Sequence, residues 1–360
     1  MQVYPIFYFY PLSKWVSFRF IAENHVRELR KYFNVQVFDE TTLTIVMPIA
    51  KLSARAVFFM QPFFYPMQIY ERKLIAKIGK PERLIGVDVA DTDHMTDYAV
   101  RLTEYATAMI VPSSFSRNSY VNSGVKIPVY VVPHGCPDSF LDPTPSKPHI
   151  FRQLYEYKVK SNVKLIQVWV LHSEYRKGLD IAYEVFNRLA GERRDVALVL
   201  RSPFKLSIFD SQIDCGKPKP KLDVYASYLS DGEIRELMDV CDIYLLSSRG
   251  GGFEHPPLLA LARGEPVVGA RGGAWEDYLP YWSLVPSHRS DVIFKGNPIH
   301  DGYGVEMEVD KAVDKLCDIL DNMEEYRARV RHHIATHVKQ KFTWGAIGLQ
   351  LKDIVMKCLY

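Results

Sequence analysis

Apolar residues between Val3 and Pro133 recur in two alternating patterns. Short runs of aromatic and β-branched residues, such as Val3 to Tyr10, are typical of buried strands, and stretches with apolar residues at helical spacing, such as Phe20 to Phe33, separate them. Further strand patterns are VQVF, AVFFM, RLIGVDVA, TAMIVP and VYVVP, and further helical patterns are MQIYERKLIAKIG, DYAVRLTEYA and residues 114–123. This alternation predicts an α/β domain whose parallel sheet is covered by helices on both faces.

A proline-rich stretch separates this part from a second one with the same plan. Pro133 to Pro148 contains five prolines and no periodicity, which is typical of a connector. Beyond it come the strand patterns VKLIQVWVL, DVALVL, CDIYLLS and EPVVGA and the helical patterns GLDIAYEVFNRLA, DGEIRELMDV and PPLLALARG. From Asp310 onward the chain reads as helical, and it ends in the amphipathic segment FTWGAIGLQLKDIV, which is long enough to pack on the first domain. We therefore expect domains at residues 1–137 and 158–337, a linker at 138–157 and a returning C-terminal helix at 338–360.

Composition excludes several classes of protein. Of the 360 residues, 48% are hydrophobic and 24% are charged, so the chain can bury a full core and is neither disordered nor collagen-like. The formal net charge of +3 lacks the basic excess of a nucleic-acid binder. Any anionic ligand must therefore be held by local groups.

The sequence also predicts a soluble protein of a reducing compartment, which favours the cytoplasm. Its five cysteines are odd in number, far apart and never in a C-x-x-C pair, which argues against a disulfide framework or a zinc knot. The N-terminal MQVYPIFYFYPLSKW lacks the basic region and cleavage site of a signal peptide and reads as a first strand. Charged residues or proline interrupt every apolar run before about 18 residues, so we expect no membrane span.

The segment from Cys241 to Asp277 carries the strongest chemical signal. A buried strand pattern ends near Ser247, three glycines (Gly250, Gly251 and Gly252) follow, and a helix is expected to open near Pro257. A glycine turn that leads into a helix at the carboxyl end of a parallel strand offers free amides to a phosphate. The strand PVVGA followed by Arg271, Gly272 and Gly273 repeats the arrangement. Either loop alone is more simply an ordinary strand-to-helix turn, but two such loops from successive strands favour a phosphate site.

The same segment resembles the signature of the retaining GT-B glycosyltransferases of the glycosyl transferases group 1 family, which includes sucrose, mannosyl and glycogen synthase-like enzymes. The matching residues are Asp242, Ser248, Gly252, Phe253, Pro256, Leu258, Ala260, Ala262, Gly264, Pro266, Val267, Val268, Gly272, Gly273 and Glu276. VKIPVYVVPHGCPDSFLDP, RKGLDIAYEVF and KFTW are similar to further segments of that family, so that the resemblance extends from about Arg83 to the end.

This resemblance implies a GT-B fold, in which two Rossmann-like doubly wound domains face each other across a cleft, the first on the acceptor side and the second binding a nucleotide-sugar. The implied reaction transfers a hexosyl group from that donor to an acceptor hydroxyl with retention of configuration, with no metal and no other cofactor. The acceptor stays open between a glycan, a lipid-linked molecule and a protein, and we expect no nucleic-acid partner and at most peripheral membrane contact. Two alternatives are a GT-B-shaped nucleotide-sugar-binding protein without transfer activity and, less favoured, a sugar-nucleotide epimerase.

Two departures from the family pattern concern the donor. The family has two glutamates eight positions apart, for the donor sugar and the ribose, and this chain has Gly251 and Leu259 there. Glu254 lies in the same loop and is a candidate for the missing first carboxylate. It is an equally good candidate for an acid that complements the dipole at a helix N-terminus. Leu259 has no such neighbour, so ribose recognition must differ or be lost.

Lys177 is the best single candidate, since it matches the family's lysine for the donor diphosphate, where a cation neutralises the departing group. The alternative, a surface lysine before a glycine, is weaker because strand, loop, R-K-G and helix fall in register. The family's partner arginine, five positions earlier, is His172 here, and Arg176 is adjacent to the lysine. Either residue can substitute for it.

The first domain contributes the segment Asp91 to His94 at a strand end that should face the cleft. Asp91-Thr92-Asp93 is formally a metal-binding D-x-D, but such a triplet arises by chance about once in a chain of this length, so we discount a metal site. The position resembles the family's first-domain cleft residues, while capping of the next helix is the simpler explanation for each aspartate alone. The expected catalytic residues are Lys177, Glu254, Asp93 and His94. The expected donor-binding residues are His172, Arg176, Arg201, Gly251, Gly252, Phe253, His255, Gly272 and Gly273.

Overall fold

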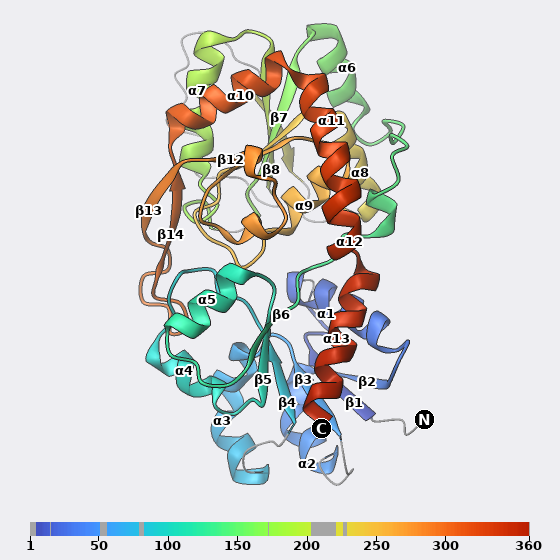
Figure 1. Cartoon of the computed structure of the whole chain (residues 1–360), viewed down its shortest axis with the longest axis vertical. Coiled ribbons are helices and arrows are strands. Elements are labelled where there is room, and N and C mark those ends of the chain that lie inside the picture. The colour runs from blue at the N-terminus through green and yellow to red at the C-terminus, as the bar shows by residue number, and fades with distance from the viewer. Residues whose placement is uncertain are drawn as a thin grey trace.

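The computed structural model describes residues 5–14, 16–50, 56–78, 83–171, 173–202, 221–225 and 229–359. Within them, two six-stranded sheets, each made of parallel strands, form the centres of two domains that lie one above the other (Figure 1). Parallel strands need crossover connections, and helices supply most of these connections.

The first domain is a doubly wound sheet with two hydrophobic cores, one on each face. Its strands are β1 (Pro5–Tyr10), β2 (Asn34–Asp39), β3 (Val57–Met60), β4 (Leu84–Val87), β5 (Ala108–Val111) and β6 (Val129–Val131), in the order β2-β1-β3-β4-β5-β6. Its helices are α1 (Ser17–Leu29), α2 (Leu43–Ala50), α3 (Phe64–Ile78), α4 (Asp97–Thr103) and α5 (Ser114–Asn122). Alternate residues of β1 enter different cores, Phe7 and Phe9 one and Ile6 and Tyr8 the other, because successive side chains of a strand point to opposite faces.

The second domain repeats the plan around one large core. Its sheet contains β7 (Lys164–Trp169), β8 (Val196–Ser202), β9 (Lys221–Tyr225), β10 (Ile243–Leu246), β11 (Val267–Ala270) and β12 (Leu284–Val285), in the order β12-β11-β10-β7-β8-β9. Its helices are α6 (Arg152–Ser161), α7 (Leu179–Glu192), α8 (Asp231–Val240) and α9 (His255–Ala262). The sequence predicted a connector through residue 157, but α6 begins inside it at Arg152. The side chain of Leu154 on α6 joins the core of this domain, which explains the helix.

A β-hairpin that the sequence analysis did not predict connects the two domains on one side (Figure 1). It consists of β13 (Ser287–Val292) and β14 (Tyr303–Met307), which are antiparallel. The loop between them, residues 293–302, reaches the first domain and is called the strap below. Within it, Ile299 is buried in a core cluster of the first domain, and Met95 and His300 form an antiparallel bridge.

The C-terminal helices return to the first domain on the other side of the molecule (Figure 1). They are α10 (Val309–Asp321), α11 (Met323–His333), α12 (Lys339–Lys341) and α13 (Trp344–Leu359). Ile347, Leu351 and Ile354 of α13 pack in the first domain's core with α1, and the Cβ of Glu28 lies against Gly348. The predicted architecture of two doubly wound domains with a returning C-terminal helix is therefore confirmed. None of the helices in the described residues is both long enough and apolar enough to cross a bilayer.

Candidate active site

The candidate site lies where loops after β7 and β10 of the second domain meet loops after β4 and β5 of the first. The turn after β7 brings Lys177 to the site, and Gly178 follows it with a positive φ of 63°. A Cβ on Gly178 would lie 1.9 Å from the carbonyl oxygen of Ser247, so only glycine permits this approach of the two loops. The hydroxyl of Ser247 donates to the carbonyl of Lys177 at 2.9 Å and fixes the loops together.

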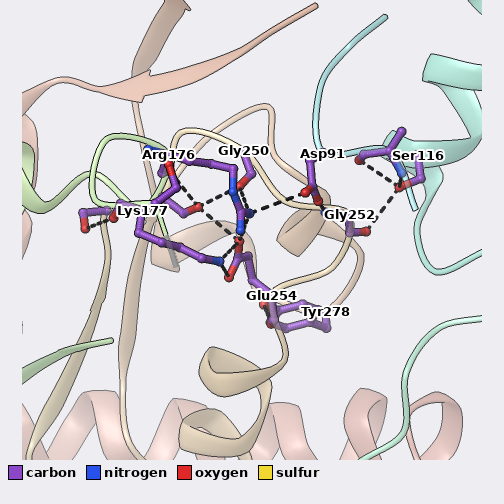
Figure 2. Close-up of polar contacts among 12 residues, drawn as sticks. Asp91, Ser116, Arg176, Lys177, Gly250, Gly252, Glu254 and Tyr278 are labelled. Atoms are coloured by element: carbon purple, nitrogen blue, oxygen red, sulfur yellow. Dashed lines mark hydrogen bonds and ion pairs between the residues drawn. The ribbon is translucent and has the colours of Figure 1, made fainter. Parts of the chain in front are cut away.

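Lys177 and Glu254 form an ion pair at the centre of the site (Figure 2). The Lys177 ammonium donates to both carboxylate oxygens of Glu254 at 2.5 Å, and the side chains are only 11% and 7% exposed. The hydroxyl of Ser248 also donates to Oε1 of Glu254 at 3.1 Å. Burial lowers the pKa of Lys177 below its usual value, and Glu254 opposes that shift. Lys177 and Glu254, two of the four residues that were predicted to be catalytic, thus lie in direct contact.

The backbone around Glu254 is built to place its carboxylate. Glu254 has a positive φ of 62°, which is uncommon outside glycine, directly before α9. The hydroxyl of Tyr278 donates to its carbonyl at 2.7 Å. A Cβ on Gly251 would lie 2.0 Å from Oε1 of Glu254, so the carboxylate fills the space into which a side chain at position 251 would project.

Asp91 is the carboxylate that the first domain brings to the centre of the site (Figure 2). Its Oδ1 accepts a hydrogen bond from the Gly252 amide at 2.7 Å, and its Oδ2 lies 3.7 Å from Nη1 of Arg176. Burial pushes the pKa of Asp91 upward, but Arg176, His300, Lys177 and the Gly252 amide outweigh it and hold the pKa below its usual value. Asp91 is therefore an ionised group that bridges the two domains.

The glycine loop touches the first domain along its length. Ser113 donates its hydroxyl to the carbonyl of Gly252 at 2.7 Å, and Ser116 does so at 3.3 Å. A Cβ would lie 2.4 Å from the Asp91 carbonyl at Gly250 and 2.6 Å from Val89 at Gly252. The sequence predicts that these glycines allow a tight turn and the approach of a ligand. In the structure, Gly250 and Gly252 also allow the two domains to approach each other closely.

The second predicted glycine loop, with Gly272 and Gly273, makes its contacts within its own domain. The amide of Gly272 donates to Glu276 at 2.6 Å, and a Cβ on Gly273 would collide with the ring of Trp275. Gly272 also borders a pocket of about 360 Å³ between the domains. The residues that line it are Asp93, Phe115, Arg271, Gly272, Ser287, His288, Arg289, Gly304 and Val305.

Other predicted donor-binding residues lie farther along the second domain. Arg201, at the end of β8, stacks on Trp169 with its guanidinium 4.2 Å from the ring centre, and burial lowers its pKa to about 10. Phe253 packs between His134 and Tyr278, and Nε2 of His255 lies 2.9 Å from the carbonyl oxygen of Gly135. Phe253 and His255 therefore face His134 and Gly135, in the segment that leads from the first domain to the second. His172 lies outside the described residues.

Asp93 and His94 hold the strap and its flanks. Asp93 accepts from the amide of Tyr303 at 2.7 Å and pairs with Arg289 at 3.3 Å. Nδ1 of His94 lies 2.8 Å from Oδ1 of Asp301. Both side chains therefore have protein partners, and their predicted catalytic contacts with a donor stay predictions.

Sequence reasoning missed Asp91 as the bridging carboxylate and missed the strap entirely. The signals for the hairpin were the alternating polar and apolar residues of GYGVEM and the turn dipeptides Asn297-Pro298 and Asp301-Gly302. Leu259 is 5% exposed and belongs to the second domain's core. At the position of the second glutamate of the glycosyltransferase signature, this chain therefore has a leucine that packs in the core.

Comparisons with known proteins agree with this architecture, although no protein-family model matches the chain. HepE of Anabaena, solved with UDP-glucose, superposes with a TM-score of 0.70 at 14% identity over 98% of this chain and 99% of its own. A glycosyltransferase from Rickettsia africae superposes with a TM-score of 0.70 at 14% identity over 100% of this chain and 99% of its own. These likenesses confirm the predicted GT-B fold.

Two viral proteins are related in sequence. "Putative glycosyltransferase 45" of Sulfolobus islandicus filamentous virus is 29% identical over 71% of this chain and 68% of its own length. "Uncharacterized protein 356" of Sulfolobus islandicus rod-shaped virus 1 is 33% identical over 98% of both chains. The chain therefore belongs to the same family as protein 356 of the rod-shaped virus.

Proposed function

We propose that the protein is a glycosyltransferase that moves a sugar from a nucleotide-sugar donor to an acceptor hydroxyl. The observation that carries the proposal is the buried pair of Lys177 and Glu254 at the head of α9, faced by Asp91 of the other domain. A buried cation beside a carboxylate at the carboxyl edge of a parallel sheet suits a diphosphate leaving group and the sugar attached to it. The HepE structure was solved with UDP-glucose, so a UDP-sugar is the first donor to test.

Arrival of the donor changes the partners of Lys177. A diphosphate oxygen competes for its ammonium, which has three N–H donors, and so weakens its hold on Glu254. Glu254 is then available to accept a hydrogen bond from the donor sugar, which strengthens as positive charge develops on the ring. Because both side chains are nearly buried, these interactions act in a site with little competing water.

Retention and metal independence are the finer parts of the proposal. Retention rests on the resemblance of the segment from Cys241 to Asp277 to retaining enzymes. Metal independence rests on the use of the two aspartates: Asp91 binds the Gly252 amide and lies near Arg176, and Asp93 binds Tyr303 and Arg289. Lys177 and Arg176 would then supply the positive charge that a metal ion supplies elsewhere.

The test is Glu254→Gln, measured as turnover with a UDP-sugar and as UDP affinity by calorimetry. We expect turnover to fall by about one to three orders of magnitude, the scale of one lost electrostatic contact in the transition state, with UDP affinity nearly unchanged. Glu324→Gln, at an 81% exposed side chain, is the matched control and should leave both quantities unchanged.

Two outcomes would contradict the proposal. Unchanged turnover in Glu254→Gln would leave Glu254 as an acid that only favours the helix N-terminus. A wild-type protein that binds the donor but neither transfers nor hydrolyses it across a panel of acceptors would be the binding protein that the sequence left as an alternative.

A further inference from the structure

The strap brings side chains of its own to the candidate site. The guanidinium carbon of Arg176 lies over the ring of Phe294, 5.7 Å from the ring centre. The centres of the Phe294 and His300 rings are 6.1 Å apart. Ile293 lies 3.6 Å from the position that a Cβ on Gly250 would take. The strap is therefore packed against the same arginine and the same glycine loop that form the site.

Two buried polar atoms at this contact have no hydrogen-bond partner among the described residues. They are Nε of Arg176 and Nδ1 of His300. A buried donor or acceptor without a partner is destabilising, so such atoms in a folded protein need an explanation. Two of them, on side chains that both lie near the ring of Phe294 at a candidate site, point to a ligand that supplies the missing partners.

The strap is held firmly enough to present His300 in one position. The amide of His300 donates to Oδ1 of Asn297 at 2.9 Å, and the amide of Thr96 donates to the carbonyl of Ile299 at 3.0 Å. Ile299 itself is only 6% exposed, within the first domain's core. A histidine held by its own amide and by the buried residue before it is preorganised for binding.

We infer that His300 and Nε of Arg176 form a subsite for a phosphate oxygen of the nucleotide-sugar donor. The inference rests on the proposed function and adds a residue from outside the glycosyltransferase signature. Arg176 supplies a charged N–H donor, and His300 supplies a second donor once it carries a proton on Nδ1. A phosphate oxygen accepts from both, whereas a purely apolar ligand would leave both unsatisfied.

Charge favours a phosphate that arrives together with a proton. The charged groups that act on His300 are Asp91 from the loop after β4, Arg176 from the loop after β7 and Asp301 of the strap. Burial lowers the pKa of His300, and Arg176 adds to this effect, while Asp91 and Asp301 oppose it. A bound phosphate favours protonated His300, so binding takes up a proton and becomes weaker as the pH rises.

The experiment measures UDP affinity by calorimetry at several values between pH 6 and pH 8 for wild type, His300→Leu and His300→Asn. The ionisation of UDP is common to all three proteins, so differences between them isolate the histidine. We expect His300→Leu to weaken UDP binding about tenfold at pH 6 and less at pH 8. His300→Asn keeps a polar group near the Nδ1 position, so it should restore part of the affinity without the pH dependence. His332→Gln, at an exposed histidine of α11, is the control and should behave as wild type.

A second measurement does not depend on the fold of a variant. In the wild-type protein, the NMR resonance of His300 should shift toward the protonated form when UDP is added, but not when uridine is added. Equal UDP affinity and pH dependence in wild type and both variants would overturn the inference and leave the proposed function intact. A loss for UDP-glucose but not for UDP would assign His300 to the sugar instead. Absence of any nucleotide binding by the wild type would overturn the proposed function itself.

Discussion

Gly251 and Glu254 share one space at the head of α9, because a Cβ on Gly251 would lie 2.0 Å from Oε1 of Glu254. The missing side chain at position 251 is thus what allows the carboxylate three residues later to reach Lys177. The glycine at position 251, where the glycosyltransferase signature has a glutamate, and the placement of Glu254 therefore depend on each other. We propose that the Glu254 carboxylate takes the place of the signature's first glutamate at this side of the site.

Gly251→Ala tests this arrangement directly. The added methyl group should displace the Glu254 carboxylate from Lys177, because the carboxylate is the flexible end that must give way. We expect turnover with a UDP-sugar to fall about as far as in Glu254→Gln, tenfold or more, while UDP affinity changes little.

The matched control is Gly191→Ala, since a Cβ on Gly191 meets no other atom within 4 Å. It should leave turnover unchanged and stabilise the protein slightly, because glycine in a helix costs about 1 kcal/mol relative to alanine. If Gly251→Ala turns over as fast as Gly191→Ala, the shared space does not matter for catalysis.

Lys177→Ala should weaken UDP binding far more than uridine binding, since the ammonium is assigned to the diphosphate. A lost charge-assisted contact predicts a tenfold to hundredfold weaker affinity for UDP and a small change for uridine. Calorimetry with uridine, UMP and UDP gives the comparison, and Lys311→Ala, at a 53% exposed side chain, serves as the control. Losses of equal size for uridine and UDP would remove Lys177 from the phosphate site.

The sequence was sufficient for the architecture because the signals for the two sheets are local. Runs such as IFYFY in β1 and IYLL in β10 are buried throughout, and apolar runs between turn residues indicate buried parallel strands wherever they occur. The resemblance to the glycosyltransferase signature also indicated two candidates, Lys177 as the match to the family's lysine and Glu254 as a carboxylate in the loop where the family's first glutamate is missing. It left open whether Glu254 faces the site, because that choice depends on a positive φ at Glu254 and on the space above Gly251.

Local sequence patterns could not predict the contacts between the two domains. Asp91 meets the Gly252 amide, a residue 161 positions away in the chain, and nothing in the segment around Asp91 indicates that distant partner. Ile299 reads as an isolated apolar residue in a polar loop, yet it is buried in the other domain. Such contacts between distant segments are settled only when the two domains are packed together.

Activity should persist in excess EDTA. Both carboxylate oxygens of Asp93 are engaged, Oδ1 by the amide of Tyr303 and Oδ2 by Arg289, and Asp91 binds the Gly252 amide. The assay is turnover with a UDP-sugar after dialysis against the chelator, followed by addition of manganese. Activity that disappears on dialysis and returns with manganese would establish the metal-dependent mechanism that we discounted.

Ile299→Ala should destabilise the protein through the first domain, although Ile299 belongs to a hairpin of the second. Truncation of a buried isoleucine costs about 2 to 5 kcal/mol of unfolding free energy. Denaturant unfolding measures the loss, and Ile45→Ala, at a 63% exposed residue of α2, is the control with an expected change within about 0.5 kcal/mol. A loss no larger than in the control would mean that the strap is not held by Ile299.

Because His25 is buried, we expect the protein to lose stability in acid. Nδ1 of His25 lies 3.0 Å from the hydroxyl of Tyr8, and that hydroxyl donates its proton to Gln61 at 2.5 Å. The ring nitrogen must therefore be the donor to Tyr8, which leaves Nε2 without a proton, and this buried atom has no partner among the described residues. A second proton would create an unpaired buried cation, so burial lowers the pKa of His25 to about 3.

The sign of the effect follows from the two states. The unfolded histidine, with a pKa of about 6.5, binds a proton between pH 6.5 and pH 3, whereas the folded one does not, so stability falls as the pH falls through this range. Between pH 7.5 and pH 5.0, this single group should remove about 2 kcal/mol from the free energy of unfolding.

The measurement is denaturant unfolding at both pH values for wild type and His25→Gln, in which an uncharged amide replaces the ring. The difference between the two pH values should be about 2 kcal/mol smaller in the variant, because other buried histidines, such as His134 and His255, contribute equally to both proteins. The same pH difference in both proteins would show that His25 takes up its proton without opposition in the folded state.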